Sequence, residues 1–157
     1  MSVIHHSAVC VRDVDASLRF WRDGLGFEVM MDERFDGDWP TLLGAASNSL
    51  RAVFLGDRAH PESGIVELVD LGSPIESVAS AGASPRPGVL LLSIMTDVDA
   101  VLGRLAELGL GGTPQRIEVS GVGMAVVIDP DGVLVELVDT GATANLGRLA
   151  RSADIRP

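Results

Sequence analysis

Two glutamates, Glu67 and Glu136, each begin a copy of the same four-residue segment, Glu-Leu-Val-Asp. They stand in Ile-Val-Glu-Leu-Val and Leu-Val-Glu-Leu-Val, which read as buried strands. A carboxylate inside such a strand is costly unless it is paired, hydrogen-bonded or bound to a metal ion. The alternative is a strand face open to water, as antiparallel sheets allow. These two residues are the first candidates for chemistry.

A second repeated segment, Asp-Val-Asp-Ala, precedes each glutamate, at 13–16 and at 97–100. The first segment of each half opens an amphipathic helical stretch, and the second closes an apolar strand-like run. A long-period repeat of this kind indicates one supersecondary unit used twice. The first copy is longer, and its extra residues are most simply placed in the polar stretch 32–49.

Hydrophobic periodicity and turn signals give the expected elements. In the first half we expect strands at 3–11, 27–31, 50–55 and 65–71, with a helix at 15–25. In the second half we expect strands at 89–95, 113–119, 123–128 and 133–139, with a helix at 98–108. The fold class is therefore α+β, with two tandem βαβββ units at 1–71 and 88–140, a linker at 72–87, and a tail at 141–157 that could form a short helix.

Composition excludes several functions. The net charge is −10 and all twelve basic residues are arginines, which argues against nucleic acid as a partner. Without lysine or tyrosine, Schiff-base chemistry and a tyrosine acid or base are excluded. The single Cys10 cannot form an intrachain disulfide. No apolar run reaches the roughly 20 residues that span a bilayer, and no signal peptide is recognisable, so we expect a cytoplasmic protein without a membrane partner.

Other side chains could complete a site. On the first strand His6, Ala8 and Cys10 share a face, because strand residues alternate. Cys10 also suits a small core position. Phe35 and Trp39 could form an apolar lid, pack the long stretch down, or contact a second subunit. Arg51 could bind a substrate carboxylate or form an exterior ion pair.

Three segments carry a family resemblance: His-Ser-Ala-Val-Cys-Val-Arg-Asp from His6, Leu-Arg-Phe-Trp-Arg-Asp-Gly-Leu-Gly-Phe from Leu18, and Asp-Pro-Asp-Gly-Val-Leu-Val-Glu-Leu from Asp129. The chain resembles the vicinal oxygen chelate superfamily, which includes glyoxalase I, extradiol dioxygenases and bleomycin-binding proteins. The resemblance implies two βαβββ units whose strands form a curved mixed sheet around a shared cavity.

The resemblance also implies metal ligands on the first and last strands of each unit. These positions fall on His6, Glu67 and Glu136, whereas the fourth falls on an apolar residue, Val89 or Leu90. The open coordination position would go to water, substrate or His60. The substrate pocket expected from the resemblance and the strand pattern comprises Ala8, Cys10, Phe35, Trp39, Arg51, Val89, Leu90 and Met124.

By this resemblance we expect a metal-dependent lyase or isomerase of the glyoxalase type, acting on a small molecule with vicinal oxygens. Glu67 or Glu136 would move a proton, and the ligand set suits Ni, Zn, Co, Mn or Fe without selecting among them. The alternative is a metal-free small-molecule or drug-binding protein of the bleomycin-resistance type. Extradiol dioxygenases of this superfamily typically bind iron through two histidines and one carboxylate, and have a tyrosine in the pocket. This chemistry is disfavoured here, since the chain lacks the second histidine ligand and any tyrosine. A homodimer is implied, with the units paired within one chain or across two.

Overall fold

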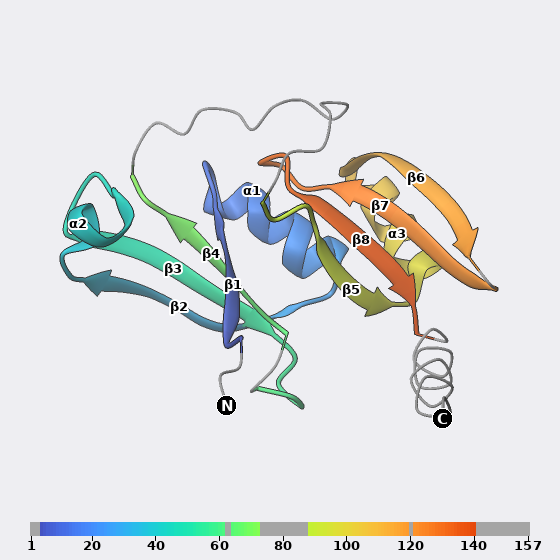
Figure 1. The fold of residues 1–157 in the computed structure, drawn as a ribbon, viewed down its shortest axis with the longest axis horizontal. Helices are drawn as coiled ribbons and strands as arrows, with labels where there is room; N and C mark the ends of the chain where they lie inside the picture. The colour runs from blue at the N-terminus through green and yellow to red at the C-terminus, as the bar shows by residue number, and fades with distance from the viewer. Residues whose placement is uncertain (1–3, 62–63, 73–87, 120, 141–157) are drawn as a thin grey trace, which may run out of the picture.

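The computed structural model describes residues 4–61, 64–72, 88–119 and 121–140 of the chain, and it shows two four-stranded sheets (Figure 1). The first repeat consists of β1 (His6–Cys10), α1 (Val14–Leu18), η1 (Arg19–Gly24), β2 (Glu28–Asp36), α2 (Trp39–Leu43), β3 (Ser49–Gly56) and β4 (Ile65–Asp70). The second consists of β5 (Leu92–Thr96), α3 (Val98–Leu108), β6 (Gly111–Val119), β7 (Val122–Ile128) and β8 (Leu134–Asp139). Residues 73–87 of the linker expected at 72–87, and the tail at 141–157, lie outside the described residues.

Both sheets have the same topology. Their strand orders are β1-β4-β3-β2 and β5-β8-β7-β6. In each, the first strand of the repeat pairs in parallel with the last, and the other neighbours are antiparallel. The predicted α+β fold of two βαβββ repeats is confirmed, with two separate sheets in place of one continuous sheet.

The repeated Asp-Val-Asp-Ala segment is a helix start in both halves. The Asp13 carboxylate accepts from the backbone N–H groups of residues 15 and 16, and the Asp97 carboxylate accepts from that of residue 100. Such caps satisfy N–H groups that have no partner within the helix. The first helix begins at Val14, one residue before its predicted start, and the second begins at Val98, as predicted.

The extra residues of the first repeat lie between β2 and β3. Strand β2 extends to Asp36, well beyond its predicted end, and α2 follows before β3 begins at Ser49. In the second repeat β6 ends at Val119 and β7 already begins at Val122. Most of the extra residues therefore lie at 37–48, inside the predicted stretch. They are not confined to it, because the connection between β3 and β4, residues 57–64, is also longer than its counterpart between β7 and β8, residues 129–133.

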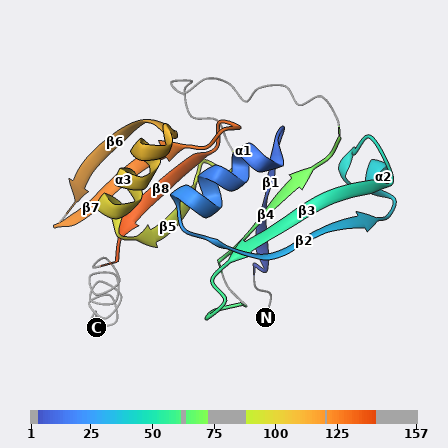
Figure 2. The same ribbon diagram turned by 180° about the vertical axis from the view of Figure 1, so that it is seen from behind.

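One hydrophobic core joins the two halves. It combines fully buried side chains of both repeats, including Phe20, Trp21, Leu105, Val127 and Leu137. Figure 2 shows α1 between β1 and β4 of the first sheet and the strands of the second. The halves thus pack through the helix-bearing faces of their sheets, which leaves the opposite faces outside the shared core. Within the described ranges, no helix is long and apolar enough to cross a membrane.

Candidate functional site

Glu67 lies on the sheet face that points away from the shared core. In β4, Val66 and Leu68 belong to that core, so the alternating residues Glu67 and Val69 point to the other side. The strand register places Ala8 and Phe54 beside Glu67. We call this surface the Glu67 face; it comprises His6, Ala8, Cys10, Met31, Glu33, Phe35, Leu50, Ala52, Phe54, Glu67 and Val69.

His6 and Glu67 form a direct pair on this face. Nε2 of His6 lies 3.1 Å from Oε2 of Glu67, with 36% of the histidine side chain and 15% of the glutamate side chain exposed. The other ring nitrogen, Nδ1, lies 2.9 Å from Nδ1 of His5. The His6 ring also meets the Phe54 ring edge-on, with centroids 5.6 Å apart. The structure therefore brings together two of the three predicted metal ligands.

A row of aromatic side chains continues from this pair into the insertion. The Phe54 and Phe35 rings lie 6.5 Å apart, and Nε1 of Trp39 donates to the carbonyl oxygen of Phe35 at 2.8 Å. Phe35, Trp39, Phe54 and Leu71 pack on a small buried cluster of Leu50, Ala52 and Val69. The insertion thus packs down onto the Glu67 face and supplies part of its apolar surface, next to the His6–Glu67 pair.

Glu136 lies on the corresponding face of the second sheet. Val135 and Leu137 belong to the core, and Glu136 points to the other side, where Oγ of Ser93 donates to its Oε2 at 2.6 Å. The Glu136 face comprises Leu91, Ser93, Met95, Gln115, Ile117, Val119, Val122, Met124, Val126, Ile128, Leu134, Glu136 and Val138. Met124 was predicted at the pocket, whereas nothing in the sequence pointed to Ser93.

The strand register corrects the position of the missing fourth ligand. His6 stands two residues before Ala8, which pairs with Glu67, and Leu91 stands two residues before Ser93, which pairs with Glu136. Leu91 is therefore the counterpart of His6, and the predicted Val89 and Leu90 are not. Counting from the helix caps failed because the first repeat has one more residue between its strand and its cap. This counterpart is also apolar, as Val89 and Leu90 are, so it offers no donor atom.

Arg51 does not belong to the Glu67 face. It alternates with Ala52 and shares the side of Val53 and Leu55, which are core residues. Its Nε and Nη2 donate to the two carboxylate oxygens of Asp32 at 2.8 and 2.7 Å, and these hydrogen bonds lower the pKa of Asp32. Arg51 thus forms the exterior ion pair that was the alternative to a substrate contact.

His60 also lies elsewhere. Its Nδ1 lies 2.8 Å from Oδ2 of Asp57, and 73% of its side chain is exposed. The partner that the structure gives His60 is therefore this loop aspartate. His60 does not fill the position left by the missing fourth donor.

The donor types at these positions suit a divalent ion, since imidazole nitrogen and carboxylate oxygen are common ligands of Zn, Ni, Co, Mn and Fe. Among the residues that the structure describes, however, no three His, Cys, Asp or Glu side chains come close enough together to hold a metal. His6 and Glu67 lie together on the first sheet, and Glu136 lies on the second. Within one copy of the chain, the His6–Glu67 pair and Glu136 are therefore in separate places.

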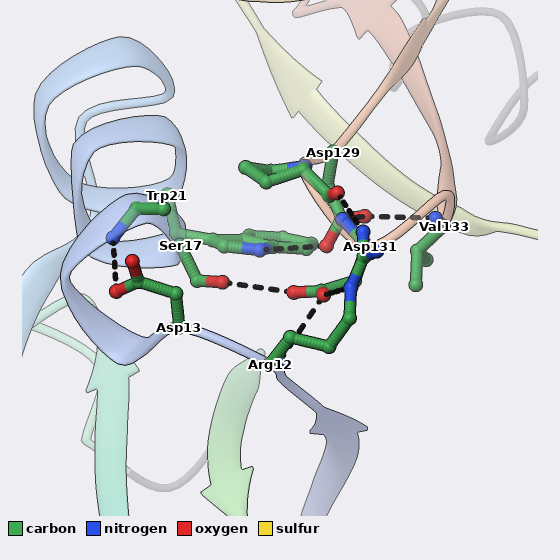
Figure 3. A network of polar contacts seen from close by, with 9 residues as sticks. Arg12, Asp13, Ser17, Trp21, Asp129, Asp131 and Val133 are labelled. Atoms are coloured by element: carbon green, nitrogen blue, oxygen red, sulfur yellow. Dashed lines mark hydrogen bonds and ion pairs between the residues drawn. The ribbon is translucent and has the colours of Figure 1, made fainter. Parts of the chain in front are cut away.

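A buried polar network holds the two halves in this arrangement (Figure 3). Oδ2 of Asp129 accepts from Nε1 of Trp21 at 3.3 Å. Asp131 accepts from Oγ of Ser17 at 3.0 Å and from Nε of Arg12 at 2.9 Å. Both aspartates are buried, and burial raises the pKa of Asp129.

The Asp-Pro-Asp-Gly segment that begins at Asp129 is a strong turn signal in the sequence, but a local turn signal carries no information about a distant partner. In the structure its two carboxylates join α1, η1 and the loop that follows β1 to the loop between β7 and β8.

A family model was matched to this chain. The model of the glyoxalase/bleomycin resistance protein/dioxygenase superfamily matches residues 3–137. This chain belongs to that superfamily. The match covers both repeats, including His6, Glu67 and Glu136, and so agrees with the resemblance drawn from the three sequence segments.

Individual relatives point the same way. A lactoylglutathione lyase-like protein, TerB of Aspergillus terreus, is 33% identical over 156 residues, covering 92% of this chain and 79% of the relative. The trypanothione-dependent glyoxalase I of Leishmania major has a similar fold, with a TM-score of 0.69, 21% identity and 98% of each chain covered. The antibiotic-binding protein TnmS3 of Streptomyces sp. CB03234 has a TM-score of 0.53 and 22% identity over 88% of this chain and 96% of its own.

Proposed function

We propose that this protein is a metal-dependent lyase or isomerase of the glyoxalase type, acting on a small molecule with two neighbouring oxygen atoms. Members of its superfamily generally use divalent metals and bind small molecules or drugs. The observation that carries the proposal is the His6–Glu67 pair. A largely buried carboxylate on an apolar face needs a partner, and imidazole with carboxylate is a donor pair for a divalent ion.

We further propose that each site is completed by a second copy of the chain, whose Glu136 face would lie opposite the Glu67 face of the first. Both surfaces expose large apolar side chains: Met31 on the first, and Met95, Ile117 and Val119 on the second. Exposed apolar patches of this kind are typical of interaction surfaces. In a two-fold dimer the same contact occurs twice, which gives two equivalent sites.

In this arrangement His6 and Glu67 of one copy and Glu136 of the other would hold the metal. A divalent ion supplies Lewis acidity, which stabilises negative charge developing on a substrate oxygen. The apolar Leu91 leaves room for the two substrate oxygens at the open position. Glu136 keeps Oε1 for the site while Ser93 holds Oε2, so this carboxylate is oriented to accept a proton from the substrate.

The second candidate is a metal-free binding protein. It is favoured by one observation, the apolar Leu91 where the first repeat has His6, and TnmS3 shows that the fold occurs in an antibiotic-binding protein. Binding alone, however, does not require a carboxylate in each of the two apolar strands.

Metal content separates the two candidates. Protein purified without a histidine tag should bind one divalent ion per chain, and Glu67→Gln should lose most of that affinity. The matched control is Glu33→Gln, which removes a carboxylate from the same face, where the register partner is Ala52. Equal behaviour of the two variants, or no binding by the parent to Ni, Zn, Co, Mn or Fe, would favour the metal-free binder.

A further inference from the structure

We propose that the site accepts an uncharged aromatic molecule with two neighbouring oxygens and rejects anionic substrates, glutathione conjugates included. This substrate class rests on the proposed function, since it concerns the same two faces. Two features carry it: the placement of the arginines, and the aromatic row beside His6 and Glu67.

The strand arginines all lie on the wrong side to bind a substrate anion. Within the described strands these are Arg34, Arg51 and Arg116. Arg34 is the register partner of Arg51, which lies on the core side of its sheet, and Arg116 is the partner of the buried Ala125. In the described part of the chain, neither the Glu67 face nor the Glu136 face carries an arginine, and the sequence contains no lysine.

Three arginines of the described helices and loops also have partners elsewhere. Arg12 binds Asp131, Arg22 binds Asp23, and Arg104 donates to the carbonyl oxygen of Gly24 at 3.0 Å. Each contact draws the guanidinium toward the helices or the core and away from the two faces. These arginines therefore provide no substitute for a cation at the site.

The charges that the faces do carry are negative. Glu33 and Glu67 lie on the first face and Glu136 on the second, and the whole chain has a net charge of −10. A glutathione conjugate brings two carboxylates, which would lose water without gaining a cationic partner and would be repelled by these glutamates. Binding energy for a substrate must therefore come from uncharged groups.

The aromatic row supplies that energy. The His6, Phe54 and Phe35 rings follow one another edge to face, with centroids 5.6 and 6.5 Å apart, and Trp39 packs at the end of the row. Aromatic pairs in such offset arrangements stabilise each other beyond the burial of their area. A substrate ring lying along the Phe54–Phe35 surface would bring its neighbouring oxygens to the His6–Glu67 end.

The test compares 2,3-dihydroxynaphthalene with its 6-sulfonate, which carries the same diol and one added anionic group, by calorimetry on metal-free and metal-loaded protein. We expect the neutral diol to bind at least about tenfold more tightly than the sulfonate, and lactoylglutathione not to bind. Glu33→Arg should reduce this preference at least about threefold, because it places a cation on the Glu67 face. The matched control is Asp36→Arg, which makes the same charge change on the opposite face of β2 and should leave the preference unchanged.

Equal affinity for the two ligands, tighter binding of the sulfonate or of lactoylglutathione, or no binding of the diol would overturn the proposed substrate class. The proposed function fails separately. If the metal-free protein shows the expected preference but no metal binds, the substrate class stands and the enzyme does not. If metal binding depends on Glu67 but the two ligands bind equally well, the proposed function stands and the proposed substrate class is wrong.

Discussion

His6 Nε2 reaches Oε2 of Glu67 at 3.1 Å although the two residues are not partners in the β-ladder. The partner of Glu67 is Ala8, and His6 pairs with Ile65. The imidazole therefore extends along the strand direction, past the small methyl group of Ala8, to meet the carboxylate. Parallel pairing of β1 with β4 is what makes this possible, because it aligns the first strand of the repeat with the strand that carries the glutamate.

The register predicts how the missing donor could be restored. Leu91→His should raise metal affinity about tenfold or more, since it places an imidazole at the position that matches His6. Val89→His is the matched control, because Val89 lies two residues earlier and is 90% exposed. Isothermal titration with Ni, Zn and Mn on the parent and both variants would measure the effect. A larger gain for Val89→His would show that the strand register does not define the site.

The polar network between the halves should contribute measurably to stability. Ser17→Ala removes the hydroxyl that donates to the buried Asp131, and we expect the free energy of unfolding to fall by about 1.5–3 kcal/mol. Ser47→Ala is the control, since the exposed Ser47 hydroxyl bonds only with the backbone of Ser49, donating to its carbonyl oxygen and accepting from its N–H group. Urea unfolding of the three proteins provides the measurement. Equal midpoints for parent and Ser17→Ala would mean that this bond does not hold the halves.

Asp129 should make the free energy of unfolding depend on pH. Burial raises its pKa in the folded state above the ordinary value of 3.8, so folding favours the protonated form. This stabilising contribution is complete below the unfolded-state pKa and is lost as pH rises through the higher folded-state pKa. The stability of the parent relative to Asp129→Asn should therefore decrease as pH rises through this window. Denaturant unfolding at a series of pH values tests this, and an increase with pH would contradict it.

Asp129→Asn should also be less stable than the parent at every pH in that series. The Asn side chain can still accept from the backbone N–H groups of residues 131 and 133 through its carbonyl oxygen. The NH2 group of the Asn side chain then faces the indole N–H of Trp21, and both groups are donors. In the parent, the indole N–H donates to a carboxylate oxygen of Asp129. A donor left unsatisfied in a buried site costs about 1–3 kcal/mol.

Ser93 is expected to orient Glu136. Removing its hydroxyl in Ser93→Ala should lower kcat several-fold with little change in KM, because the carboxylate would lose the hydrogen bond that fixes Oε2. Ser93→Thr keeps a hydroxyl and should restore most of kcat. Steady-state kinetics with the first substrate that is turned over would test this. A change confined to KM, or no rescue by threonine, would assign Ser93 a different role.

The repeat and the helix caps were predictable because they depend on local sequence. Asp13 and Asp97 cap their helices through residues two or three positions away, and the alternation around Glu67 and Glu136 is visible in the strands themselves. Local signals of this kind fixed the fold class and the face on which each glutamate lies.

Features that depend on distant pairing were not predictable. The correspondence of Leu91 to His6 follows from a parallel ladder between segments more than forty residues apart, and turn lengths between repeats do not preserve it. The ion pair of Arg51 with Asp32 depends on the pairing of β3 with β2, two strands separated in the sequence by the insertion. The contact of Ser17 with Asp131 joins the two halves, and the local sequence around either residue does not predict the other as its partner.

The central claim is that His6 and Glu67 of one copy and Glu136 of another form one metal site. Its most direct test is to measure high-affinity metal sites in Glu67→Gln protein, in Glu136→Gln protein, and in a mixture of both produced by co-expression. Each variant alone should lack such sites. The mixture should regain about a quarter of the parent's sites, because half of randomly formed dimers would be mixed and each would contain one intact site. No recovery in the mixture, with mixed dimers shown to be present, would contradict a site shared between copies.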